Sequence, residues 1–282
     1  MNPNARAKPD AIELKQHGYL LLAHSESMRQ GFIQNMKLQH ALGVPSELLS
    51  VEDCLNLVPA LNPDEIVGGS ICHKDGTASP FLWLDALLKA ARREGAQVHF
   101  NHPVLAIKRQ GESFLVETPR HDFHAGKVVI CTDWAAPQLL KPLSVDLPIS
   151  GMPKEAVVTE PWKPLLGPAI VSFKHDMFVN QMSRGSILAI PSRIRPDSAD
   201  HESTHDFLGF AAHKVLDLLP SLSDINIIRS WAGVISKTPD MQAILGETGV
   251  PDLYVAVSAY KGFMTSPAVG RVMAEIVIDG HS

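Results

Sequence analysis

The sequence predicts an α/β fold that carries an α+β insertion, and two observations lead to this prediction. In residues 80–148, and again from residue 228 onward, amphipathic helical stretches alternate with short β-branched apolar runs. In residues 149–227 the expected strands are short and are interrupted by proline, glycine and polar turns, which is typical of an antiparallel sheet. A chain of 282 residues is long enough to bury the cores of two domains.

The domain boundaries are placed where these patterns change. Residues 1–17 are expected to be a disordered lead-in. Residues 18–79 and 149–227 are expected to form an antiparallel-sheet domain, and residues 80–148 and 228–282 an α/β domain. The two predicted domains therefore interleave along the chain.

The first predicted domain begins with a buried strand over residues 18–23. Ser25 is positioned to cap a helix that ends near Leu42, and Ser50 opens a second, short helix with a capping box. A further strand is expected over residues 66–72.

The second predicted domain begins with a helix at Pro80. Its apolar positions share one face: Leu84, Leu87, Leu88 and Ala91. Strands are expected over residues 96–100, in a hairpin over residues 104–118, and over residues 127–132. The last of these is rich in β-branched residues, as in a buried parallel strand, and Cys131 is interpreted as a small buried residue within it.

The C-terminal strand–loop–helix is the clearest candidate for a binding site. An apolar strand over residues 253–258 leads through a loop containing Gly262 to Ser266 and Pro267, which are expected to cap and begin a helix. The first turn of a helix presents free N–H groups and a partial positive charge, which suit an anionic ligand. The same unit also occurs throughout α/β folds without a ligand.

Residues 229–270 also resemble a known family. They are similar to the C-terminal signature of the D-amino-acid-oxidase-like FAD-dependent oxidoreductases, which include glycine oxidase, sarcosine oxidase and the β subunits of opine oxidases and proline dehydrogenases. The landmarks occur in the family's order: Arg229 to Gly233, Thr238-Pro239-Asp240, Leu245-Gly246, Gly262-Phe263-Met264 and Pro267 to Gly270. With weaker matches upstream, the resemblance spans residues 18–279.

The resemblance implies a partial FAD-binding Rossmann-like domain and oxidation of an amino acid or secondary amine by hydride transfer to the flavin. It places Gly262, Phe263 and Met264 at the isoalloxazine, and it assigns Val104 and Thr132 to the rest of the cofactor. Because no cysteine lies near residues 262–264, FAD is expected to be bound non-covalently. The resemblance does not assign a catalytic residue.

Three features depart from the family's pattern. The sequence contains no GxGxxG loop, which normally holds the pyrophosphate, so FAD binding by this chain alone is expected to be weak or absent. Asp133 stands where relatives usually have a glycine beside the dinucleotide. Asn180 and Gln181 stand where several relatives have an arginine that binds the substrate carboxylate, so Asn180 and Arg193 are the substrate-binding candidates.

Two functional hypotheses remain open. The chain is either an FAD-dependent amine or amino-acid oxidoreductase, or part of one, or else a remnant or accessory subunit that cannot hold FAD alone and acts beside another flavoprotein subunit. A net charge of −5 argues against nucleic acid as a partner. The absence of an apolar run of about 20 residues argues against a membrane span, and a cytoplasmic location is expected.

Other chemistries are less well supported by the sequence. Histidines occur at ligand-like spacing in His99 with His102, His121 with His124, and His201 with His205, but these read as solvated positions and no metal site is predicted. No GxSxG motif accompanies the serines, which disfavours nucleophilic hydrolysis.

Overall fold

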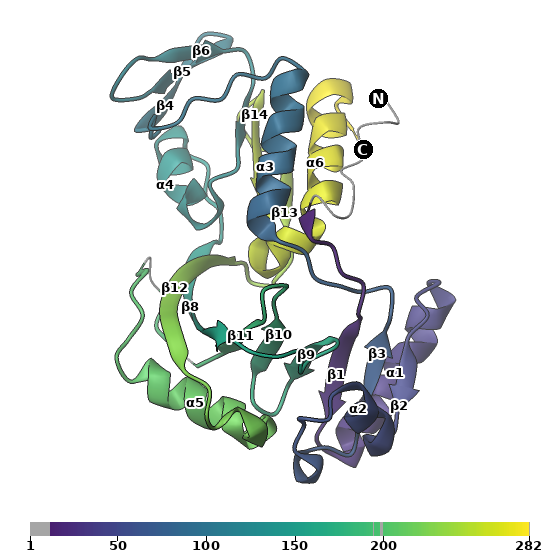
Figure 1. The fold of residues 1–282 in the computed structure, drawn as a ribbon. Helices are drawn as coiled ribbons and strands as arrows, with labels where there is room; N and C mark the ends of the chain where they lie inside the picture. Colours follow the sequence, from purple (N-terminus) through teal and green to yellow (C-terminus); the bar gives the residue numbers. More distant parts are fainter. Residues whose placement is uncertain (1–11, 194, 198–199, 282) are drawn as a thin grey trace. The chain divides into compact units, whose positions relative to one another are not determined.

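The computed structural model describes residues 12–193, 195–197 and 200–281, and it divides the chain into two compact units (Figure 1). Unit 1 comprises residues 1–96, 154–194 and 202–232, and unit 2 comprises residues 97–153, 195–201 and 233–282. The first eleven residues of the predicted lead-in lie outside the described residues. The rest of it is not disordered, because Lys15 and Thr77 exchange two backbone hydrogen bonds of 2.9 Å.

A large, mainly antiparallel sheet is the centre of unit 1. Its described strands follow the order β12-β8-β11-β10-β9-β1-β3-β2, in which β1 and β9 pair in parallel. The bounds are β1 Tyr19–Ala23, β2 Glu47–Leu49, β3 Gly68–Cys72, β8 Ser150–Pro161, β9 Ala169–Ser172, β10 Met177–Gln181, β11 Ser186–Pro191 and β12 Ile227–Lys237. The boundary predicted at residue 228 therefore falls inside β12.

The two faces of this sheet differ in burial. One face packs into the core with α2 (Val51–Leu57) and α5 (Phe207–Leu218), and its buried residues include Leu20, Ile170 and Val179. The intervening residues of the same strands are only half-buried: Tyr19, Leu21, Val171, Phe178, Asn180, Leu188 and Ile190. Because side chains alternate along a strand, these residues form one continuous, mostly apolar face.

The helix starts predicted in unit 1 are confirmed. The Ser25 hydroxyl accepts a hydrogen bond from the Met28 N–H at the start of α1 (Glu26–Ala41), and Ser50 and Asp53 form the capping box of α2. Ser79 caps α3 (Pro80–Arg93), whose proline occupies the first turn. Despite its predicted apolar stripe, α3 contains no buried residue, so the described residues do not fully cover it.

Unit 2 contains two small sheets and a long C-terminal helix. The order β13-β14-β7 makes one sheet, in which β14 and β7 are parallel, and β4-β5-β6 makes the other. The bounds are β4 Ala106–Gln110, β5 Ser113–Glu117, β6 Phe123–Ala125, β7 Val128–Ile130, β13 Ile244–Glu247, β14 Leu253–Val257, α4 Ala136–Leu140 and α6 Gly262–Asp279. Short 3-10 turns occur in both units: Pro63–Glu65 and Pro220–Leu222 in unit 1, and Asp133–Ala135, Lys141–Leu143 and Ala259–Lys261 in unit 2.

Two predictions for unit 2 are wrong. Residues 96–100 are exposed and form no strand, because a strand needs a hydrogen-bonding neighbour and no described segment pairs with them. Cys131 is exposed rather than buried, because β7 ends at Ile130, one residue before it. Among the described residues, no helix is both long and apolar enough to cross a lipid bilayer.

Candidate functional site

The start of α6 in unit 2 differs from the predicted start. The helix begins at Gly262, after a turn over Ala259–Lys261, and not at Ser266 and Pro267. No side chain caps it, so Gly262, Phe263 and Met264 occupy the first turn with N–H groups that lack the usual capping acceptor. The three residues that the resemblance assigns to the flavin are therefore the ones that present the helix end.

Ser266 and Pro267 have a different role from the one predicted. Proline has no N–H, so Pro267 cannot donate to the carbonyl four residues earlier, which is that of Phe263. The Ser266 hydroxyl donates to this carbonyl instead, at 3.0 Å, and the Thr265 hydroxyl donates to the Lys261 carbonyl at 2.9 Å. These side-chain bonds let the helix run through the proline, so it can start five residues before the predicted position.

The turn before α6 brings the backbone close to itself. Ala259 has a φ of +50°, in the left-handed region that favours glycine. A Cβ added at Gly262 would lie 3.2 Å from the Cβ of Ser258, which is tighter than ordinary van der Waals contact. Glycine at position 262 thus fits a close approach of the chain to Ser258 and leaves the helix end unobstructed by a side chain.

Asp133 follows β7 in unit 2 and adopts a φ of +50°, a conformation that favours glycine. Its carboxylate accepts hydrogen bonds from the N–H and the hydroxyl of Ser236, at 3.2 and 2.7 Å. Ser236 is fully buried, so the carboxylate is engaged by an internal partner. Thr132 beside it and Val104 before β4 are both exposed.

Asn180, on β10 of unit 1, lines a cavity of about 270 Å³. The cavity gathers one cationic side chain, Lys15, with the hydroxyl groups of Thr77 and Ser183. No other described residue forms a hydrogen bond to the Asn180 side chain, so its amide is available to a ligand. This cavity therefore offers a cation and a free amide to a small polar molecule with a carboxylate.

Gln181 also lines the cavity but is occupied by the backbone. Its Oε1 accepts from the N–H groups of Leu165 and Leu166, at 2.8 and 3.0 Å. Its Nε2 donates to the carbonyls of Lys163 and Gly185, at 3.0 and 2.9 Å. Gln181 therefore fixes the loop before β9, while the neighbouring Asn180 faces the cavity.

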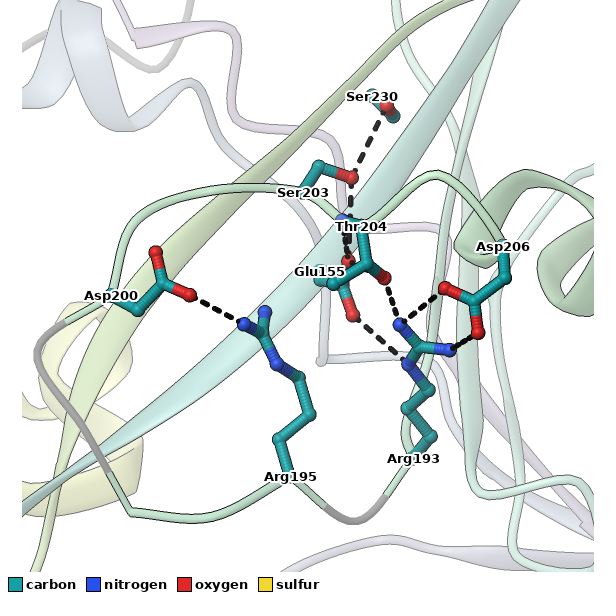
Figure 2. Close-up of polar contacts among 8 residues, drawn as sticks. All are labelled: Glu155, Arg193, Arg195, Asp200, Ser203, Thr204, Asp206 and Ser230. Atoms are coloured by element: carbon teal, nitrogen blue, oxygen red, sulfur yellow. Dashed lines mark hydrogen bonds and ion pairs between the residues drawn. The ribbon is translucent and has the colours of Figure 1, made fainter.

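Arg193 lies in a network of charged and polar side chains in unit 1 (Figure 2). Its Nε donates to Glu155 at 3.1 Å, and its two terminal nitrogens donate to Asp206 at 2.8 and 3.2 Å and to the Thr204 hydroxyl. The pKa of Asp206 is lowered, mainly by these hydrogen bonds from Arg193. A substrate carboxylate would therefore have to displace Asp206 to reach this guanidinium.

Glu155 is the buried centre of this network, with a side chain that is 1% exposed. Besides Arg193, it accepts hydrogen bonds from the N–H and the hydroxyl of Thr204, at 2.6 and 3.0 Å. Figure 2 shows these groups reaching the Glu155 carboxylate on β8 from the segment after β11 and from the segment before α5. Because a buried charge needs such partners, Arg193 has a structural role here whatever its role toward substrate.

Lys154 is a residue that sequence reasoning missed. It precedes Glu155 on β8, so it lies on the opposite, half-buried face of the sheet, where its ammonium group donates to the Ser192 hydroxyl. Burial lowers the pKa of Lys154, and the charge of Asp176 partly opposes this effect. Its sequence signal was weak: a lysine shortly before the apolar run of residues 156–158, beside the charged Glu155.

Comparison with known proteins decides the family. The family model for DAO, FAD dependent oxidoreductase, matches residues 4–276. The chain belongs to this family of FAD-dependent oxidoreductases. It is 24% identical to the sarcosine oxidase subunit beta of Rhodobacter capsulatus, over 96% of this chain and 67% of the relative. It is 26% identical to the D-amino acid dehydrogenase of Rhizobium rhizogenes, over 96% of this chain and 66% of the relative.

A solved member of the same fold supports this assignment. The crystal structure of L-proline dehydrogenase from P. horikoshii superposes with a TM-score of 0.92 at 28% identity, over 96% of this chain and 74% of that chain. The mixed α/β architecture is therefore that of the family's flavoenzymes. The chain spans about two thirds of the length of the curated relatives it matches.

The described residues fit one end of FAD better than the other. The first turn of α6, with Gly262 and no capping side chain, fits the anionic pyrimidine edge of a flavin ring. The carboxylate of Asp133 is held by two neutral donors of Ser236, which leave its negative charge in place, and this charge would repel a nearby phosphate. The sequence printed here has no GxGxxG loop for the pyrophosphate.

Proposed function

We propose that this chain contains the substrate-binding and flavin-facing part of an FAD-dependent enzyme that oxidises the C–N bond of an amino acid or secondary amine. The start of α6 carries this proposal, because its uncapped N–H groups belong to Gly262, Phe263 and Met264. When bound, FAD supplies the acceptor for the hydride that leaves the substrate carbon. Val104 and Thr132 are proposed to contact the rest of the cofactor.

The substrate is proposed to bind beside Asn180. A carboxylate in this cavity would receive a hydrogen bond from the Asn180 amide and a favourable charge interaction from Lys15. Arg193 is the alternative anchor, and it reaches a carboxylate only if Asp206 gives up its two hydrogen bonds. The relatives' names point to small substrates, because they include sarcosine oxidase and D-amino acid dehydrogenase.

Anaerobic flavin reduction tests this proposal. The chain is mixed with excess FAD, and bleaching of the flavin absorbance is followed after addition of sarcosine, glycine, a D-amino acid or L-proline. We expect one of these compounds to reduce the flavin, and Asn180→Ala to raise the concentration needed for half-maximal rate. Gln181 is unsuitable as a control because it holds a loop, so Asn35→Ala is the matched variant, since Asn35 lies on α1 outside the cavity. No reduction by any amine or amino acid, with FAD shown to be bound, would remove the proposal.

A second candidate is an accessory chain that keeps the family's fold but does not hold FAD alone. Two observations favour it: no GxGxxG loop is present, and residues 96–100 lie exposed without a strand partner. A sarcosine oxidase subunit beta among the relatives fits a chain that works within an assembly. The absorbance spectrum after gel filtration separates the two candidates. Retained flavin that acid precipitation releases supports the enzyme, whereas a colourless protein that gains flavin only with a second subunit supports the accessory chain.

A further inference from the structure

Two loops of unit 2 bring three histidines together. His99 and His102 lie in the segment between α3 and β4, and His121 lies in the turn between β5 and β6. The ring centroids are 5.5 Å apart for His99 and His102, 5.8 Å for His99 and His121, and 4.9 Å for His102 and His121. One nitrogen of each ring lies within 4.8 Å of a nitrogen of the other two.

The geometry of His102 prepares one nitrogen for a ligand role. Its Nδ1 lies 2.7 Å from the carbonyl oxygen of Phe100, which can only accept, so Nδ1 carries the hydrogen. Nε2 of the neutral ring then keeps its lone pair. A histidine whose second nitrogen donates to a carbonyl is the usual arrangement around a bound metal, because it fixes both the tautomer and the ring orientation.

The backbone around His121 is held in place as well. The hydroxyl of Thr118, a buried residue, donates to the His121 carbonyl, and it accepts a hydrogen bond of 3.4 Å from the His121 N–H. The Phe123 ring lies 4.2 Å from the His121 ring and 5.0 Å from the His99 ring, centroid to centroid. With the His102 ring 6.1 Å from the same phenyl ring, all three imidazoles pack around Phe123.

We propose that His99, His102 and His121 bind a divalent transition-metal ion, with Zn²⁺ as the best match. Imidazole nitrogens suit zinc, copper and nickel, whereas Mg²⁺ and Ca²⁺ need oxygen ligands that this group lacks. Three histidines leave a fourth position open for water or another ligand. His99 and His121 are exposed and His102 is half-buried, so an ion can enter from solvent.

Only a small adjustment of the rings is needed. Zn–N bonds of about 2.0–2.1 Å in a tetrahedral site put the nitrogens about 3.3 Å from one another. In the structure the three ligand nitrogens lie within 4.8 Å of one another, and rotation of the side chains in these loops can shorten these distances to about 3.3 Å. The ion would join the two loops across a hairpin, and it would therefore also hold the segment that leads to Val104.

The second histidine cluster in the molecule does not suit a metal equally well. His24 uses both ring nitrogens, with Nδ1 2.6 Å from the Glu65 carbonyl and Nε2 2.8 Å from the Ser172 hydroxyl. The Glu65 carboxylate is paired with Lys174 at 2.6 Å and with His175 at 3.1 Å. A metal ion there would have to break several existing hydrogen bonds. In the group of His99, His102 and His121, by contrast, each ring has a nitrogen that forms no hydrogen bond with another described residue.

Zinc titration of the EDTA-treated chain tests the proposal. Isothermal calorimetry with Zn²⁺ alone is expected to show a saturable site of one ion per chain in the wild type. His121→Ala should weaken this site by about 100-fold or more, because loss of an outer-shell partner alone typically costs 10–100-fold. His124→Ala is the matched control, since His124 is a nearby exposed histidine on β6 outside the cluster, and it should bind as the wild type does.

Two further measurements keep the outcome decisive. Co²⁺ should give visible absorption bands with the wild type and with His124→Ala, and these bands should disappear with His121→Ala. If circular dichroism shows that His121→Ala is misfolded, His99→Gln replaces it, because the His99 side chain forms no hydrogen bond with another described residue that the substitution would break. Unchanged zinc affinity in the folded ligand variant, or no saturable binding by the wild type, would overturn the proposal.

Discussion

Replacement of Arg193 by alanine gives the sharpest test of the reasoning about unit 1. The substitution removes the cation that pairs with Glu155, whose side chain is 1% exposed. A buried carboxylate without its cation costs far more than an exposed one, because the interior does not replace the lost hydration. We therefore expect Arg193→Ala to lower the stability of the protein, whether or not substrate is present.

The magnitude follows from what remains around Glu155. Breaking a buried ion pair by removing one partner costs about 3–5 kcal/mol. The lower end applies here, because Thr204 still donates two hydrogen bonds to the carboxylate and the Arg193 side chain is itself 22% exposed. In a Glu155→Gln background no buried charge is left behind, so the same Arg193→Ala change should cost only about 1 kcal/mol, because the other bonds of Arg193 go to the exposed Asp206 and to the Thr204 hydroxyl.

Urea unfolding followed by tryptophan fluorescence measures both changes. The difference between the two backgrounds, about 2 kcal/mol, is the coupling energy of the pair. Equal cost in both backgrounds, or a cost below about 1 kcal/mol in the wild type, would refute the structural role of Arg193. A variant that keeps wild-type stability but needs much more substrate for half-maximal rate would identify Arg193 as the substrate anchor instead.

Three more predictions concern glycine, pH and a backbone conformation. Gly262→Val should lower FAD affinity, because a Cβ at this position already lies 3.2 Å from the Cβ of Ser258 and the larger side chain would crowd the helix start. Gly270→Ala is the control in the same helix: it has open space and should leave FAD affinity unchanged in a fluorescence titration. Burial lowers the pKa of His24 in the folded protein, so below about pH 6.5 the unfolded chain binds more protons than the folded one. The urea midpoint should therefore fall as the pH is lowered from 7.5 to 5. This fall should be smaller in His24→Gln. Asp133→Ala and Asp133→Gly lose the same two hydrogen bonds, but only the alanine variant keeps an unfavourable φ of +50°. Asp133→Ala should therefore unfold at a lower urea concentration than Asp133→Gly. Equal urea midpoints for the two variants would contradict this.

The place of several candidate site residues in the fold could be predicted from the sequence because their local pattern is decisive. Gly262, Phe263 and Met264 follow an apolar strand and precede a helix, so their place at a helix end was predictable even though the start of α6 was set five residues too late. The error came from Ser266 and Pro267, which usually begin helices. Here the Ser266 hydroxyl satisfies the carbonyl that proline leaves free, and this bond is not visible in a residue pattern.

The alternation of patterns, the helix caps at Ser25 and Ser50, and the family can be inferred from the sequence, because they depend on neighbours a few residues apart or on ordered landmarks. Three other features emerge only once the chain is folded: residues 96–100 lack a strand partner among the described residues, Arg193 is paired with buried Glu155, and His121 meets His99 and His102. Each of these depends on side chains or strands that are distant along the chain. Their distances and burial arise from packing, which local periodicity does not encode.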